Sequence, residues 1–281
     1  MGFTVTIEGA DFSGNGEESV FAAETFIRNA QITDDIIKNA YRQLYTDLEA
    51  AGAFLKCQAI YAFGGGTALS DSINLVYPAL GISAPAYQIT WLNDTTGAHT
   101  RAGYIPDGLT GRVANTNFPI NGDINGFHLH VFNKTASTNT NAFLAGAQAN
   151  ATGNAFYIGL HRRGNTFTKG AFSPYSAPFY LAAPGGYDIN KTGLLSLVRT
   201  TGGVEKLYDN GVVIAQTTRS DTWQTNGNTP LYVGGLSTGT SNPSVNADCT
   251  IRGAIVGFAQ LTDSEVLAYK EAFARFDTAM A

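Results

Sequence analysis

The alternation of hydrophobic and polar residues over 194–258 predicts a series of antiparallel β-strands. Asn210-Gly211 separates two alternating stretches, and this dipeptide favours a two-residue type I′ hairpin turn, which requires positive φ at both positions. Thr201-Gly202-Gly203 marks a second turn upstream, so the first three strands should be neighbours in one sheet. The expected strands are 194–199, 204–209, 212–215, 231–235 and 251–258.

Two other segments have the three- and four-residue hydrophobic spacing of amphipathic helices. The first is 33–51, with Thr33 as the expected N-cap. The second is 262–280, where Thr262 and Glu265 predict a capping box. Each apolar stripe must be buried, either because the two helices pack together or because they contact another subunit. The stripes consist of Ile37, Tyr41, Leu44, Leu48 and Ala51 in the first helix, and of Val266, Tyr269, Phe273, Phe276 and Met280 in the second.

The chain divides into three parts on this reading. Residues 1–30 predict an extended arm, residues 31–52 the first helix, and residues 53–281 one β-rich domain that ends with the helix at 262–280. No further helix is expected between 56 and 259, because the pattern there is one of short strands and loops. Additional strands are expected at 58–63, 87–91, 126–132, 141–146 and 155–160.

The order of these parts resembles a known domain. The strings Leu207-Tyr-Asp-Asn-Gly-Val-Val-Ile-Ala, Leu231-Tyr-Val-Gly-Gly and Gly253-Ala-Ile-Val-Gly-Phe, then Leu261-Thr-Asp-Ser-Glu-Val, resemble concanavalin A-like, laminin G-like jelly rolls. The resemblance implies an all-β fold, a two-sheet antiparallel jelly-roll sandwich with an N-terminal arm and helix and a C-terminal helix. Upstream, Asp11-Phe-Ser, Ile32-Thr-Asp and the segment 56–67 are similar in order to bacteriophage virion proteins that carry this domain.

Composition narrows the classes of function. Hydrophobic residues make up 44% of the chain and charged residues only 14%, so Ser, Thr, Asn and Gly must cover much of the surface. A net charge of -5 disfavours nucleic-acid binding, which needs a basic stripe. No apolar run reaches the length of a membrane span, so membrane insertion is not expected. The first residues lack the pattern of a secretory leader, so classical secretion is not expected either.

The acidic residues give little support for an enzyme. Retaining glycoside hydrolases need two carboxylates beside the scissile bond, and endoglucanases of this fold supply them from an E-x-D-x-x-E strand that this chain lacks. No glutamate occurs between Glu49 and Glu205. We therefore do not expect an enzyme, although residues distant in sequence can meet in a fold. The acids of that interval are Asp71, Asp94, Asp107, Asp123 and Asp188.

A pair of histidines is the next candidate for chemistry. His128 and His130 alternate with Phe127, Leu129 and Val131, so both imidazoles should lie on the same face of a strand. They could bind a metal or act as a base, or they could belong to an ordinary polar face. No third ligand is evident in the sequence, and the Q-x-H string of jelly-roll alginate lyases is absent, so we favour the ordinary face.

Aromatic and basic residues are the candidate glycan contacts. Trp223, in a polar segment, and Tyr104 could stack on sugar rings, whereas Trp91 is expected in the core. His161-Arg162-Arg163 is the only basic cluster, and it could bind a sugar carboxylate or sulfate through bidentate contacts. The alternative for this triplet is a solvated turn or a salt bridge between subunits.

No cofactor is expected, with calcium as the alternative. Asp94, Asp107 and Asp123 fall near predicted loops, where laminin G-like domains often bind calcium. The segment 64–67, Gly-Gly-Gly-Thr, lacks the lysine of a phosphate-binding loop and is not expected to precede a helix, so it is interpreted as a turn. The two cysteines, Cys57 and Cys249, are expected to be buried thiols rather than a disulfide.

The resemblance implies a virion structural protein displayed on the head or tail surface, which acts by docking. Other virion proteins and further copies of the chain are the expected partners, because symmetric self-association is common. Carbohydrate recognition, as in a host-adhesion module, is compatible with that role, and a polysaccharide-cleaving enzyme is the remaining alternative. The location within the virion stays open. The candidate assembly contacts in the arm are Phe3, Val5, Ile7 and Phe12.

Overall fold

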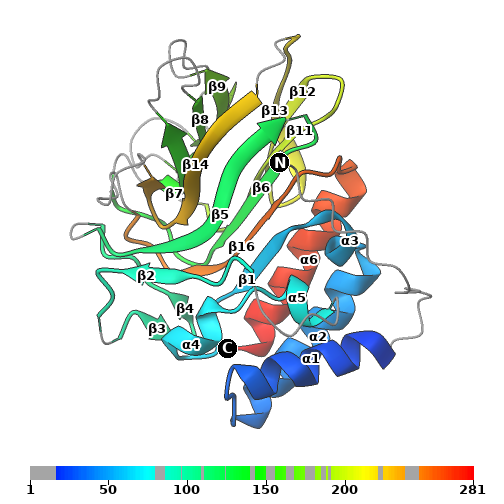
Figure 1. Ribbon diagram of the computed structural model, residues 1–281, viewed down its shortest axis with the longest axis vertical. Helices are drawn as coiled ribbons and strands as arrows, with labels where there is room; N and C mark the ends of the chain where they lie inside the picture. Colours follow the sequence, from blue (N-terminus) through cyan, green and yellow to red (C-terminus); the bar gives the residue numbers. More distant parts are fainter. Residues whose placement is uncertain are drawn as a thin grey trace.

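The computed structural model has three layers, in which helices cover one face of a β-sheet and a second sheet covers its other face (Figure 1). We call the middle sheet, which contacts the helices, sheet A and the other sheet B. The predicted two-sheet sandwich with flanking helices is confirmed. The structure describes residues 17–79, 86–95, 97–108, 111–123, 125–139, 143–149, 156–162, 168–174, 181–184, 188, 191–220, 224–237 and 247–281.

Sheet A is antiparallel throughout its described pairings. Its strands are β1 (Ala59–Ala62), β3 (His99–Thr100), β4 (Gly103–Tyr104), β6 (His128–Asn133), β11 (Gly193–Arg199), β12 (Val204–Asp209), β13 (Val212–Thr218) and β16 (Ile251–Gly257). They follow the order β13-β12-β11-β6-β16-β4-β3, and β1 pairs with β16 on the same side as β4. Neighbours in space are therefore mostly distant in sequence.

Sheet B is antiparallel except for one short parallel pairing of β15 with β7. Its strands are β2 (Thr90–Leu92), β5 (Val113–Asp123), β7 (Phe143–Ala149), β8 (Phe156–Arg162), β9 (Thr168–Pro174), β10 (Leu181–Ala182), β14 (Gln224–Val233) and β15 (Leu236–Ser237). They follow the order β10-β9-β8-β7-β14-β5-β2. The sequence pattern did not predict β5 or β9, although β5 is the longest strand described.

The helical layer is built mainly from the two predicted amphipathic helices. The helices are α1 (Glu17–Asn29), α2 (Asp35–Ala50), α3 (Ala53–Lys56), α4 (Ala68–Ser72), α5 (Val76–Ala79) and α6 (Asp263–Ala279). Helices α2 and α6 pack against each other, and α1 packs against α2 and α5. The capping box at Thr262 and Glu265 is confirmed. No helix in the described ranges is both long and apolar enough to cross a membrane.

Three expectations about helices were wrong. The arm 1–30 contains helix α1, which buries alanines and two larger apolar side chains against α2. Short helices α4 and α5 lie within 56–259, and Thr67 caps α4 directly after the glycine run. The N-cap of α2 is Asp34 rather than Thr33, because the Asp34 carboxylate accepts hydrogen bonds from the amides of Ile36 (2.8 Å) and Ile37 (3.2 Å).

The predicted hairpin is confirmed by its backbone geometry. Asn210 and Gly211 both have positive φ, 53° and 81°, and they connect β12 to β13. Gly203, with φ of 75°, lies in the turn between β11 and β12. The three strands are therefore neighbours, as the turn residues indicated.

Gly211→Ala is expected to lower the free energy of unfolding by about 1–3 kcal/mol, the range for backbone strain in a sparsely populated conformation. A Cβ at this position would also lie 2.7 Å from Cδ1 and 3.1 Å from Cα of Leu267 in α6. Urea denaturation followed by circular dichroism would measure the change. Gly52 also has positive φ, but a Cβ added there would lie in open space. Gly52→Ala therefore measures the backbone strain without the clash and should lower the free energy of unfolding less.

The inner core lies between the two sheets and follows strand alternation. Leu129 and Val131 of β6 and Leu195 and Leu197 of β11 point toward sheet B and are fully buried. The opposite faces of these strands are buried too, because the helices cover them. Sheet A therefore has two buried faces, whereas an antiparallel sheet in a simple sandwich has one wet face.

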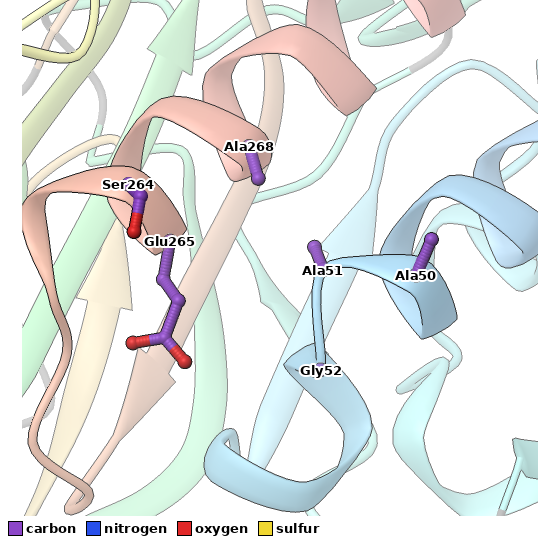
Figure 2. A pocket seen from close by; sticks show the side chains of 6 residues that line it. All are labelled: Ala50, Ala51, Gly52, Ser264, Glu265 and Ala268. Carbon is purple, nitrogen blue, oxygen red and sulfur yellow. The ribbon is translucent and has the colours of Figure 1, made fainter.

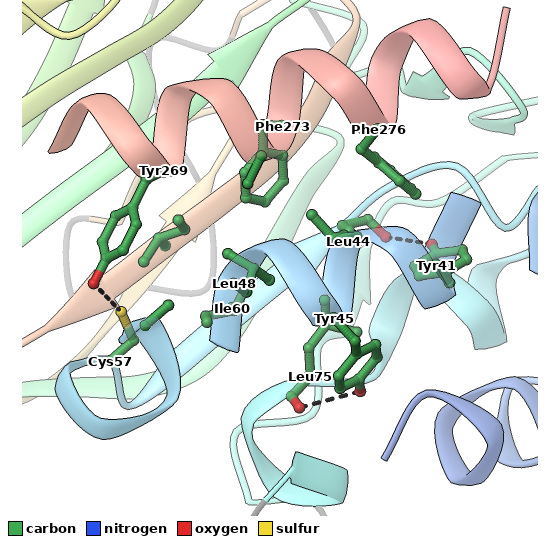
Figure 3. Close-up of a cluster of buried hydrophobic side chains, with 14 of the residues drawn as sticks. Tyr41, Leu44, Tyr45, Leu48, Cys57, Ile60, Leu75, Tyr269, Phe273 and Phe276 are labelled. Atoms are coloured by element: carbon green, nitrogen blue, oxygen red, sulfur yellow. Dashed lines mark hydrogen bonds between the residues drawn. The ribbon is translucent and has the colours of Figure 1, made fainter. Parts of the chain in front are cut away.

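The outer core lies between sheet A and the helices (Figure 3). The phenol rings of α2 fix its position through hydrogen bonds to carbonyl groups, from Tyr41 to Ala62 (2.7 Å) and from Tyr45 to Leu75 (3.1 Å). The ring of Tyr41 also meets Phe276 of α6 at a centroid distance of 4.9 Å. The two helices thus bury their apolar stripes against each other within one chain, which decides between the two alternatives left by the sequence.

Candidate functional site

Short strands from both sheets meet at one end of the sandwich, beside α4 (Figure 1). Strand β2 of sheet B carries Trp91, while β3 and β4 of sheet A carry His99 and Tyr104 as a cross-strand pair. The three rings pack together, with centroid distances of 4.3 Å (Trp91–His99), 4.7 Å (Trp91–Tyr104) and 5.4 Å (His99–Tyr104). The rim cluster, as we name this site, consists of Asp71, Trp91, Asp94, His99, Tyr104, Asp107 and Arg112.

His99 contacts a carboxylate through each of its ring nitrogens. Nδ1 lies 3.0 Å from Asp71, which is fully buried, and Nε2 lies 3.3 Å from Asp94, whose side chain is 28% exposed. The amides of Gly64 and Gly65 also donate to Asp71, at 3.0 and 3.1 Å. Burial raises the pKa of Asp71, although the hydrogen bonds from His99 and the two glycines oppose the shift. The glycine run therefore binds an internal carboxylate, not a phosphate.

The hydroxyl of Tyr104 is a buried donor with no hydrogen-bond partner in the described part of the chain, and Nε of Arg112 is another. Burial and the charges of Asp94 and Asp107 raise the pKa of Tyr104, while Arg112 acts in the opposite direction. These charged groups therefore act on the Tyr104 hydroxyl electrostatically. Arg112 also approaches Asp107 at 4.0 Å and donates to the carbonyl of Ile105 at 3.1 Å. A buried donor without an acceptor is costly, so an oxygen atom supplied by water or a ligand is expected here.

Tyr104 was predicted to stack on a sugar ring, and this prediction was wrong. Its ring is fully buried between Trp91, His99 and Phe63, so no face is open to a ligand. The hydroxyl is buried as well, so it can bind only a ligand atom or water that enters the rim cluster. Trp91 is partly buried against the core, as expected, and its indole N–H donates to the carbonyl of Ala68 at 3.0 Å.

The rim cluster can bind hydroxyl groups more readily than it can transfer protons. Asp94 and Asp107 can accept hydrogen bonds, and Arg112 and Tyr104 can donate them. A general base needs a ring nitrogen directed at its substrate, but both nitrogens of His99 face carboxylates. This arrangement fits recognition of a polar, hydroxyl-rich molecule.

The histidine pair lies on one face of β6, as predicted, but that face is not an ordinary polar surface. Both rings are fully buried beneath α6, and Nδ1 of His128 lies 3.0 Å from Nε2 of His130. Burial lowers the pKa of His128 to about 4 and lowers that of His130 as well. The rings are therefore neutral structural groups without access to substrate. Nδ1 of His130 and the hydroxyl of Ser196, its cross-strand neighbour, have no partner in the described part of the chain.

The two cysteines are buried in different cores, Cys57 under the helices and Cys249 between the sheets, and no disulfide joins them. This agrees with the predicted buried thiols. The hydroxyl of Tyr269 lies 3.6 Å from Sγ of Cys57. Burial raises the pKa of Cys57 to about 12, so its thiol stays protonated and unreactive at neutral pH.

A shallow groove of about 370 Å³ separates the end of α2 from the start of α6 (Figure 2). Ala50, Ala51, Gly52, Ser264, Glu265 and Ala268 line it. The one carboxylate in this groove is already engaged, since Lys56 binds Glu265 at 2.5 Å and Thr262 donates to it in the capping box. Burial acts to raise the pKa of Glu265, but these partners outweigh it and lower the pKa. The groove therefore lacks the paired groups of a reactive centre.

Several predicted residues cannot be placed. Trp223, Arg163 and the arm residues Phe3, Val5, Ile7 and Phe12 lie outside the described residues. The backbone of β8 includes His161 and Arg162, which pair with Phe143, Lys169 and Thr168, but their side chains are not described.

The three aspartates considered for calcium do not form a metal site in the described part of the chain. No group of three or more histidine, cysteine or acidic side chains there could hold a metal ion. Asp94 contacts His99, Asp107 approaches Arg112, and Asp123 ends β5.

Comparisons with known proteins found no matching family model and no matching curated protein. Similar solved structures include the CBM40 domain of the Ruminococcus gnavus IT-sialidase bound to α2,3-sialyllactose, at 15% identity and a TM-score of 0.43, over 59% of this chain and 97% of that chain. Domain 4 of the arabinanase AbnA from Geobacillus stearothermophilus, in complex with arabinotriose, is similar at 18% identity and a TM-score of 0.46, over 76% and 98%. The Trypanosoma rangeli sialidase is similar at 12% identity and a TM-score of 0.49, over 76% of this chain and 32% of that chain.

Proposed function

We propose that this protein is a non-catalytic bacteriophage virion protein, displayed on the head or tail surface, whose sandwich binds a glycan through the rim cluster. The virion role is supported by the order of short strings that resemble such proteins and by the low content of charged residues. In this role the chain docks to other virion proteins and to copies of itself, and the sandwich contacts the host surface.

One observation carries the glycan-binding part. The buried hydroxyl of Tyr104 and the buried Nε–H of Arg112 lack acceptors in the described part of the chain, and carboxylates that reach the surface act on the same groups. Sugar hydroxyls both donate and accept hydrogen bonds, so they match this mixture of groups. The partly exposed side chain of Trp91 adds an apolar contact.

The charges of the rim favour a neutral sugar over an acidic one. Among the described residues of the rim cluster, the carboxylates of Asp71, Asp94 and Asp107 outnumber the basic groups, which are the guanidinium of Arg112 and the imidazole of His99. A sialic acid carboxylate would meet more acidic than basic groups among these residues, and like charges oppose binding. We therefore expect a neutral oligosaccharide as the ligand.

Asp94→Asn is expected to weaken binding of a neutral oligosaccharide about tenfold, because one charged acceptor contributes about 1.4 kcal/mol or more. Isothermal titration calorimetry with the neutral ligand selected on a glycan array would measure it, with arabinotriose and sialyllactose as neutral and acidic reference probes. Asp35→Asn is the matched control, because this exposed carboxylate on α2 pairs only locally with Lys38. Unchanged affinity in Asp94→Asn, or an array on which no neutral glycan binds, would contradict the proposed site.

The virion role has a separate test. Antibodies against the protein should label the head or tail surface of phage particles in electron micrographs, and mass spectrometry should find the protein in purified particles. Particles that lack the protein would contradict this part of the proposal alone. Release of reducing ends from a panel of polysaccharides by the purified protein would contradict the non-catalytic part.

A further inference from the structure

Strand β13 ends sheet A, and in the described part of the chain only β12 pairs with it. Its sequence, Val-Val-Ile-Ala-Gln-Thr-Thr, contains no charge and no proline, and five of its seven residues are β-branched. Val212 and Val213 at its start are 64% and 36% exposed. Such an edge presents a row of unpaired backbone N–H and C=O groups to any strand that can approach it.

In the described part of the chain, the other end strands and the outer edges of β1 and β5 are protected in ways that natural proteins use against edge pairing. Strands β2, β3 and β10 end their sheets with only two or three residues each. The outer edge of β1 is covered, because Ile60 N–H donates to Asn74 (2.9 Å) and the Ile60 carbonyl accepts from Leu75 (2.8 Å). Beyond its pairing with β2, β5 is interrupted by Asn117, with φ of 54°, and by Pro119.

Strand β13 has none of these protections over its second half. A bulge opposite Leu207 and Tyr208 disturbs the pairing near the hairpin turn, but the pairs from Ala215 to Thr218 are regular. Strand β10 of sheet B lies near β13 and forms its backbone pairs with β9. The regular half of β13 therefore lies at the end of the seven-strand path of sheet A. It forms an uncharged edge made of residues that favour strands.

We propose that β13 pairs antiparallel with β13 of a second copy of this chain, so that two A sheets join across a two-fold axis. The strand suits a copy of itself because self-pairing places no like charges opposite each other, and like charges directly opposite destabilise a strand pair. Two-fold homodimers are also the commonest closed assemblies. With the pair centred on the regular half, Gln216 of each copy lies close to the axis.

The hairpin tip extends this interface onto the helical layer. Leu267 of α6, which is 41% exposed, lies against Gly211 next to the exposed Val212. A contact of one strand and a few apolar side chains falls below the about 1,200 Å² of a standard interface. The dimer should therefore be weak in solution, with micromolar dissociation, and it gains from multivalency when many copies are held together.

Gln216→Lys and Gln216→Glu test the proposal as a pair. Each substitution places two like charges near the axis, so sedimentation velocity should show that each variant dissociates at least tenfold more readily than the natural chain. An equimolar mixture of the two variants should recover association, because the opposite charges then face each other. Gln43→Lys is the matched control at an exposed position of α2, away from β13, and should associate like the natural chain.

The outcomes separate the alternatives. A chain that stays monomeric at millimolar concentration, or a dimer that Gln216→Lys leaves intact, overturns the proposed edge pairing. Loss of association in both variants without recovery in the mixture overturns the two-fold geometry. Glycan affinity per chain should be the same in all these proteins, so failure of the dimer and failure of the proposed glycan site are distinguishable.

Discussion

Asp277→Ala is expected to lower the free energy of unfolding by about 3 kcal/mol, because it removes one partner of a buried ion pair. Arg252 of β16 is fully buried, and its Nε and Nη2 donate to the Asp277 carboxylate of α6 at 2.8 and 2.6 Å. Its Nη1 donates to the carbonyls of Phe63 and Arg101, at 3.1 and 2.6 Å. Without Asp277 the guanidinium charge stays buried under the end of α6. The expected loss lies at the lower end for such pairs, because Asp277 is itself partly exposed.

Chemical denaturation would measure the effect of Asp277→Ala, with Arg275→Ala as the control. Arg275 lies on the same helix and pairs with Asp47 at 2.8 Å, but its side chain is half exposed, so its loss should cost less than about 1 kcal/mol. Equal effects of the two substitutions would contradict the argument. Adding Arg252→Met to Asp277→Ala should restore part of the stability, since an apolar side chain needs no counter-charge.

Acidification from pH 6.5 to pH 4 is expected to remove about 3 kcal/mol of stability through His128 alone. Burial lowers the pKa of this imidazole from 6.5 to about 4 in the folded protein. Between these values the unfolded chain binds a proton that the folded chain does not. The contribution is therefore fully present above pH 6.5 and is lost as the pH falls toward 4. His130, whose pKa is lowered too, adds in the same direction.

Denaturation midpoints measured across this window would show the loss, and replacement of both histidines by glutamine should flatten the curve. If that variant does not fold, NMR titration of the imidazoles in the natural chain remains decisive, because their chemical shifts should stay those of neutral rings down to about pH 4.5. Lys56 and Glu265 act on His128 with opposite charges. Tyr269 contacts His130, and its hydroxyl and the neighbouring Cys57 thiol stay uncharged. A flat stability curve in the natural chain would contradict the burial argument.

The fold was predictable where local chemistry and pattern agree. The hairpin at Asn210 and Gly211 and the capping box at Thr262 could be placed because backbone conformation and cap geometry depend on a few neighbouring residues. Helix α1 was missed although its buried residues recur at helical spacing, since two of its four buried apolar residues are alanines, which give little apolar signal. Strand β5 was missed because it contains Pro119 and several asparagines, and its pairing with β14 overrides their low strand preference.

The candidate site could not be predicted as a unit. Asp71, His99 and Arg112 come from segments that the sequence separates by up to 41 positions, and no local motif connects them. Tyr104 was chosen for its ring, but the ring packs between the sheets and only its hydroxyl reaches the polar groups. His128 and His130 were expected on an ordinary polar face of a strand, but that face is buried because α6 covers it.

The sequence by itself determined the turns, the caps and the two amphipathic helices, because these depend on the conformational preferences of residues close together in the chain. Only the tertiary structure decided that α6 lies over β6, that β2, β3 and β4 bring the rim cluster together, and that β13 ends a sheet. Those outcomes depend on which apolar surfaces bury each other over long sequence separations. Burial then sets the chemistry of each polar group, since the same histidine or tyrosine behaves differently in water and in a packed interior.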